Sequence, residues 1–103
     1  MIVIVVYVPA SHVEEVKLSM FAAGAGRIGE YSHCAWQVLG CGQFMPSPQA
    51  KPHIGEAEKL ARVDEYRVEM VCEDALVDSV INAMRAAHPY EEPAYHAYPS
   101  MVN

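Results

Sequence analysis

The sequence predicts an α+β fold in which four strands form one antiparallel sheet and two helices cover a single face of it. A strand followed by a helix occurs twice along the chain. The apolar stripes of the two helices align residue by residue: Val13, Val16 and Met20 with Val77, Val80 and Met84. The strand of the second copy, 65–72, alternates apolar and polar side chains. This alternation favours an antiparallel sheet with one side facing solvent.

The first strand–helix unit begins with residues 2–8, which are apolar on both alternating faces. This pattern indicates a central strand that is covered on both sides or lies at an interface. Ser11, with Glu14 three residues later, forms a capping box and predicts the start of the helix. Gly24 supplies the left-handed conformation that ends it.

The remaining elements complete the topology. Glu73 and Asp74 lie where the start of the second helix favours acidic side chains, and Pro89 ends that helix. Shorter strands are predicted at 34–38 and 95–98. The order is therefore β-α-β-β-α-β, the split βαβ or ferredoxin-like arrangement, and right-handed crossovers leave little topological choice.

The segment 40–60, between the second and third strands, is rich in proline and glycine. A loop of this length in a small domain is usually functional or holds structure of its own. We expect a short hairpin strand at 43–45 and a single helical turn at 56–60.

Composition narrows the class of protein. The 103 residues suffice for a single domain, 1–103, with its own core. Seven Lys and Arg against 13 Asp and Glu give a net charge of −6, which disfavours nucleic acid as a partner. Three cysteines without a C-x-x-C pair are typical of a reduced, cytoplasmic protein. The apolar run 2–8 is too short for a signal peptide or a membrane span, so we expect no membrane partner.

The run 24–29, GAGRIG, matches the G-x-G-x-x-G pattern of dinucleotide-binding sites. That pattern requires glycines that follow a strand and open a helix, whereas these follow a helix and open a strand. We therefore interpret the run as a helix end and a tight turn, with positive φ at Gly24 and at Gly26 or Gly29. A phosphate or sulfate near Arg27 is a weaker alternative.

Residues 88–95, HPYEEPAY, form the densest polar cluster of the chain. Adjacent carboxylates beside a histidine serve acid–base chemistry or bind a cation, although in most loops they are simply solvated. If a divalent metal binds, we expect its ligands among His88, Glu91, Glu92 and His33. His88 also has a structural alternative, in which its ring bonds the last carbonyls of the second helix.

The predicted topology places the two helix-to-strand loops, 24–31 and 88–95, at opposite ends of one subunit. A site that uses both loops would therefore have to form between subunits. Cys34 and Cys72 are expected in the core. His33 and Cys34, at strand spacing, would point to opposite faces of the sheet.

Four segments carry a resemblance that runs nearly end to end: 8–9, 21–34, 54–56 and 87–95. They resemble the domain inserted in YqfO-type, Nif-three-like proteins, which is itself similar to the PII signalling proteins and the CutA divalent-cation-tolerance proteins. The resemblance implies the ferredoxin-like fold and a trimer. It also implies a stand-alone insert without the two-metal centre that the parent family carries in flanking domains. Cys41 and Met45 depart from the family pattern, which has a basic residue at the place of Met45.

The residues and the resemblance together predict a non-enzymatic, oligomeric module that regulates or binds a ligand at clefts between subunits. The chain has no G-x-S-x-G, zinc signature or nucleophile beside an obvious base. The alternatives are a cation-tolerance role like that of CutA, or an accessory role to a metal-dependent hydrolase. No cofactor is required, but a divalent metal ion is an option. The candidate ligand-binding residues are Gly26, Arg27, Gly29, Tyr31, His33, His88, Tyr90, Glu91, Glu92 and Tyr95.

A homo-oligomer is expected because the outward side chains of strand 2–8 would form an exposed apolar patch in a monomer. The resemblance favours a trimer, and a dimer of paired sheet faces comes next. The partner beyond other copies of the chain is an unidentified small ligand or protein.

Overall fold

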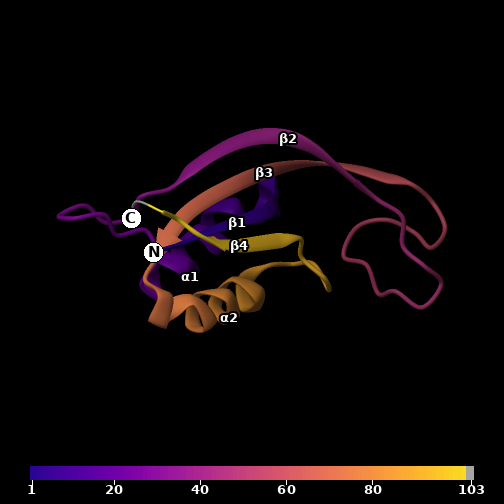
Figure 1. Cartoon of the computed structure of the whole chain (residues 1–103). Helices are drawn as coiled ribbons and strands as arrows, with labels where there is room; N and C mark the ends of the chain where they lie inside the picture. The colour runs from indigo at the N-terminus through magenta and orange to yellow at the C-terminus, as the bar shows by residue number, and fades with distance from the viewer. Residues whose placement is uncertain (102–103) are drawn as a thin grey trace.

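The structure, a computed structural model, describes residues 1–101 and consists of one sheet with two helices on the same side of it (Figure 1). The strands are β1 (Ile2–Pro9), β2 (Trp36–Phe44), β3 (Ala61–Cys72) and β4 (Tyr95–Pro99). The helices are α1 (Val13–Ala22) and α2 (Val77–Ala87), preceded by the short 3-10 turns η1 (Ala10–His12) and η2 (Asp74–Leu76). The sheet order is β2-β3-β1-β4 and every neighbouring pair is antiparallel, so the predicted fold is confirmed.

The core lies between the helices and one face of the sheet. Ile4, Val6 and Val8 of β1 project into it at alternate positions. The side chains that align in the two helices meet there as well, and four of them are fully buried: Val16, Met20, Val80 and Met84. The internal repeat therefore places equivalent residues in equivalent core positions.

β1 is the central strand of the sheet, because it pairs with β3 on one side and β4 on the other. Val5 lies on the face away from the helices, opposite Glu69 of β3 and His96 of β4, and is still only 1% exposed. On this outward face Val5 is therefore covered within one subunit, whereas Val3 and Tyr7 are only half-buried. In the described part of the chain, no helix is long and apolar enough to cross a membrane.

β2 and β3 form a long hairpin that projects beyond the other strands (Figure 1). Phe44 pairs with Ala61, so residues 40–44 belong to β2 and the connecting loop is 45–60 rather than the predicted 40–60. The expected helical turn at 56–60 is wrong. Lys59 N–H does bond the Glu56 carbonyl, but Glu58 has a φ of 61°, which is incompatible with a helix.

The predicted capping box at Ser11 is also wrong. α1 begins at Val13, and no side chain caps it. Ser11 lies one turn earlier, in η1, where its Oγ is 2.7 Å from Nδ1 of His12. The 3-10 turn moves the N-cap position one residue along, from Ser11 to His12, and the Ser11 hydroxyl bonds the His12 ring instead of the helix.

The glycine loop, 24–31, adopts the predicted backbone. Gly24, Gly26 and Gly29 have φ values of 110°, 79° and 57°. Gly26 is tied to the sheet, because its N–H donates to the Val71 carbonyl (2.8 Å) and its carbonyl accepts from Cys34 N–H (2.8 Å). The glycines therefore end α1 and turn the chain back toward β2.

His33 and Cys34 differ from expectation. His33 has a φ of 58° and precedes β2, so the two residues are not at strand spacing. Its ring packs on Phe21, with centroids 5.0 Å apart. Cys34 is only half-buried, whereas Cys72, at the end of β3, is in the core as predicted.

The glycine loop offers a matched pair of substitutions. A Cβ at Gly26 would lie 2.7 Å from the Phe21 ring and 3.0 Å from the Cys34 carbonyl, while a Cβ at Gly29 would meet nothing within 4 Å. We expect Gly26→Ala to lower the free energy of unfolding by roughly 2–4 kcal/mol, through strain and overlap. Gly29→Ala should cost about 1 kcal/mol, from the left-handed backbone alone. Urea unfolding measures both, and equal costs would contradict the steric argument.

Candidate functional site

The ten predicted ligand-binding residues divide between the two ends of the sheet. The glycine loop lies where Ile2 pairs with Cys72 and Pro99. The segment 88–94 lies at the opposite end, where β1 stops at Pro9 (Figure 1). The predicted separation of these loops within one subunit is therefore confirmed.

A cavity of about 470 Å³ lies at the Pro9 end of the sheet, between the loop 45–60 and the segment 88–94. The two segments are joined there by a hydrogen bond, because Lys51 N–H donates to Oε1 of Glu91 over 3.1 Å. Within the loop, Glu58 N–H donates to the Pro46 carbonyl over 2.7 Å. This volume falls in the range of small-molecule sites.

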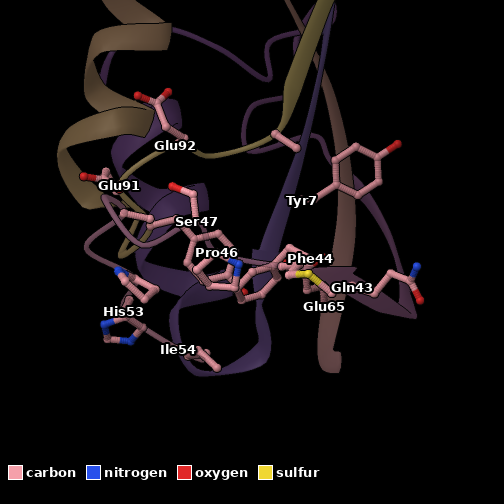
Figure 2. Close-up of a pocket in the computed structure, with 15 residues that line it drawn as sticks. Tyr7, Gln43, Phe44, Pro46, Ser47, His53, Ile54, Glu65, Glu91 and Glu92 are labelled. Carbon is pink, nitrogen blue, oxygen red and sulfur yellow. The ribbon is translucent and has the colours of Figure 1, made fainter. Parts of the chain in front are cut away.

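The walls of the cavity are largely apolar and aromatic. They include Phe44, Pro46, Pro52 and Ile54 from β2 and the loop that follows it. The Phe44 ring lies 6.1 Å from that of Tyr90, centroid to centroid, and links the loop to the segment after α2. In Figure 2, Phe44, Pro46 and Glu65 lie together at the centre of the view.

Acidic groups supply the charge of the cavity. Glu91 and Glu92 lie to one side, on the segment that follows α2 (Figure 2), and Glu65 comes from β3. The Tyr90 hydroxyl is buried and has no hydrogen-bond partner of good geometry. Burial, and then the nearby Glu65 carboxylate, raise the pKa of Tyr90 far above its ordinary value of 10.0, so this hydroxyl keeps its proton.

His88 lies behind the cavity as a structural residue and is only 6% exposed. Its Nε2 lies 2.7 Å from the Tyr7 carbonyl, and its Nδ1 accepts the Tyr90 N–H over 3.1 Å. These partners define a neutral ring that donates from Nε2. The predicted bond to the last carbonyls of α2 is wrong, because the ring turns to the end of β1 instead.

The four proposed metal ligands do not come together within one subunit. His33 lies beside Phe21 at the glycine-loop end, while His88 has both ring nitrogens engaged at the other. Glu91 and Glu92 remain exposed at the cavity. Among residues 1–101, no group of three His, Cys, Asp or Glu side chains is placed to hold a metal ion.

The other predicted residues lie away from the cavity. Arg27, Gly29, Tyr31 and His33 are exposed at the tip of the glycine loop, and Gly26 is buried at its base. Tyr95 begins β4, where its ring lies 5.8 Å from the Arg85 guanidinium. Of the ten, only Tyr90, Glu91 and Glu92 line the large cavity.

No family model matches the chain. Curated relatives do match it: over 94 residues, the chain is 51% identical to the GTP cyclohydrolase 1 type 2 homologs of Mycobacterium leprae and of Bacillus subtilis. It is also 44% identical to a Bacillus cereus protein related to NIF3, with a TM-score of 0.82 over 97% of this chain. The chain is homologous to one segment of these NIF3-related proteins. It spans about a quarter of the length of the curated relatives it matches.

Other solved structures resemble the chain in fold alone. The match to CutA1 of Pyrococcus horikoshii has a TM-score of 0.72 at 16% identity. It includes 100% of this chain and 87% of the CutA1 chain. The match to the PII-like protein CutA of a Nostoc species has a TM-score of 0.69 at 13% identity. It includes 98% of this chain and 82% of the Nostoc chain. The ferredoxin-like fold of PII and CutA proteins is thereby shown.

Sequence reasoning missed several of the residues that line the cavity. Tyr7, Phe44 and Glu65 come from three different strands, and each reads as an ordinary strand residue. The only local signal was the proline-rich loop 45–60, which supplies Pro46 and Pro52. Strand register, rather than local sequence, brings the three strand residues to the same end of the sheet.

The buried His88 makes stability depend on pH. Burial lowers the pKa of its ring below the ordinary value of 6.5, although the bond to Tyr7 opposes the shift. The unfolded chain binds a proton near pH 6.5 while the folded chain does not, so the free energy of unfolding should fall as the pH drops below 6.5. His88→Gln, which keeps a donor but cannot titrate, should flatten this decline and cost about 1 kcal/mol at neutral pH.

Urea unfolding between neutral and mildly acidic pH measures the effect. His33→Asn is the control, because this exposed residue tolerates asparagine in its left-handed conformation. An unchanged decline in His88→Gln would contradict the assignment.

Proposed function

We propose that the chain is a ligand-binding module that performs no reaction of its own and acts within a homo-oligomer, as a regulatory component. The cavity between the loop 45–60 and the segment 88–94 is the observation that carries this proposal. It combines apolar walls with a few convergent polar groups, the combination by which small-molecule sites gain affinity and orientation.

The chemistry of the cavity supports binding rather than catalysis. Ser47 and His53 both line it, which is the pair that a nucleophile and its base would need. The His53 ring, however, packs edge-on against His12, with centroids 5.7 Å apart. In the described part of the chain, no hydrogen bond joins the Ser47 hydroxyl to His53.

The enzyme name that the relatives carry is compatible with a module that performs no reaction of its own. The name GTP cyclohydrolase 1 type 2 homolog applies to proteins about four times as long, of which the chain matches one segment. A reaction carried out by such a protein could use groups outside the matched segment. In that setting the chain would be an accessory, ligand-sensing domain.

The face of the sheet opposite the helices supports the oligomer. Trp36 and Val38 of β2 lie on it with Tyr98 of β4, and Trp36 is 62% exposed. An aromatic and aliphatic face of this kind is typical of an interface between subunits. A trimer is favoured and a dimer comes next. Only a neighbouring subunit could bring a glycine loop near the cavity, because within one subunit the two lie at opposite ends.

The oligomer can be tested by mass. We expect light scattering after size-exclusion chromatography to give close to three times 11.4 kDa at micromolar concentration. Trp36→Glu should lower that mass, because it places a charge on the apolar face. Glu30→Gln, at the tip of the exposed glycine loop, is the control. A wild-type mass near 11.4 kDa would contradict the proposal.

The cavity can be tested by filling it. Ser47 lines the cavity from the exposed loop, whereas the nearby Gln49 is exposed and does not line it. Metabolites that stabilise the wild-type chain in a thermal-shift screen should lose their effect on Ser47→Trp and keep it on Gln49→Trp, since only the first indole occupies the binding volume. A screen without hits, or hits that survive Ser47→Trp, would refute this site.

A further inference from the structure

The charges of the large cavity have one sign. The charged side chains that line it are Glu65, Glu91 and Glu92, and no lysine or arginine side chain of residues 1–101 is among the lining groups. Such a site repels phosphates and carboxylates and attracts cations. The remaining lining groups are uncharged or apolar, apart from the His53 imidazole.

Two of the three carboxylates are already engaged at the rim. Glu91 accepts the Lys51 N–H, and Glu92 lies 3.9 Å from the Arg85 guanidinium with its side chain 83% exposed. Glu65 differs, because it is half-buried and lies beside the Tyr90 hydroxyl. Among the described residues, no lysine, arginine or histidine forms an ion pair with it.

The backbone of β2 holds Glu65 in this place. The Glu65 side chain lies directly over Gly42, so closely that a Cβ at Gly42 would overlap its Oε1. Only glycine leaves room for the carboxylate at this position. The backbone of Gly42 is not left-handed, so this room is the structural reason for a glycine here. Gly42 is therefore a positioning residue for the carboxylate.

The groups around Glu65 suit an organic cation. The Tyr90 hydroxyl is buried beside the Glu65 carboxylate, and its oxygen has lone pairs that can accept a hydrogen bond. Tyr7, Phe44 and Tyr90 supply aromatic rings, whose faces attract an ammonium or guanidinium group. Phe44, Pro46 and Ile54 offer apolar surface to the body that carries the cation.

We propose that the cavity binds a small organic cation, an ammonium or guanidinium group on an apolar or aromatic body, with Glu65 as its counter-ion. This inference rests on the proposed ligand-binding function and adds the chemical class of the ligand. The volume of about 470 Å³ favours a free small molecule over a folded partner.

A pair of probes that differ in charge tests the class. Phenethylamine and phenethyl alcohol share an aromatic body, but only the amine is cationic at neutral pH. Binding to the full chain is followed by NMR, from the ring signals of Tyr7, Phe44 and Tyr90. We expect the amine to bind at least tenfold more tightly than the alcohol, about the contribution of one charge-assisted hydrogen bond.

Variants assign the preference to Glu65. Glu65→Gln should remove most of the tenfold preference, because it keeps the shape and loses the charge. Glu56→Gln is the matched control: it removes an equal charge from the same end of the molecule, at an exposed carboxylate paired with Lys59. Gly42→Ala keeps every charge but displaces the Glu65 carboxylate, so it should weaken the amine as well. This variant carries the test if Glu65→Gln does not fold by circular dichroism.

The outcomes separate this inference from the proposed function. If the alcohol, or the anion phenylacetate, shifts the same ring signals as strongly as the amine, the ligand class is wrong while the cavity remains a binding site. The proposed ligand class is also wrong if the amine binds Glu65→Gln and Gly42→Ala as tightly as the wild type. It is equally wrong if the amine does not bind at millimolar concentration. Failure of the proposed function itself would appear in the Ser47→Trp experiment, where no metabolite would depend on the cavity.

Discussion

The pairing of β1 with both β3 and β4 is the constraint on which the rest of the structure depends. β1 belongs to the first strand–helix unit, and its two neighbours flank the helix of the second. Its inward residues, Ile4, Val6 and Val8, are the apolar surface that both helices cover. Because burial of apolar side chains is the main favourable term in folding, β1 holds the two halves of the molecule on one core.

The same strand also anchors the candidate site. Tyr7 lies just beyond Val6, the last residue of β1 that pairs with β4, and the segment 88–94 bonds both of its backbone groups. Tyr7 N–H donates to the Ala94 carbonyl over 3.1 Å, and the Tyr7 carbonyl lies 2.7 Å from His88 Nε2. Unpaired backbone groups at this partly covered position would be costly. The His88 ring thus takes the place of a strand partner for Tyr7. Its bond holds the segment that carries Tyr90, Glu91 and Glu92 against the end of β1.

The shape of the site depends on a glycine and a proline that carry none of its charge. Gly42 leaves room for Glu65, and Pro46 is buried where the loop 45–60 leaves β2. The result is a half-buried carboxylate next to a phenol, close to apolar walls where water competes less for it. Its neighbours Glu91 and Glu92 remain at the solvent edge, where their effect is weaker.

Local sequence by itself determined β1, the two helices, the apolar side chains that they bury and the glycine turn. Period-two and helical patterns of apolar residues depend only on near neighbours, as does the positive φ of Gly24, so β1, both helices and Val16, Met20, Val80 and Met84 could be predicted. Tertiary structure alone decided the cavity, because Tyr7, Phe44 and Glu65 meet only through strand register. It also decided the role of His88, whose partner carbonyl is far away in sequence. Contacts of this kind depend on how elements pack, which no local pattern encodes.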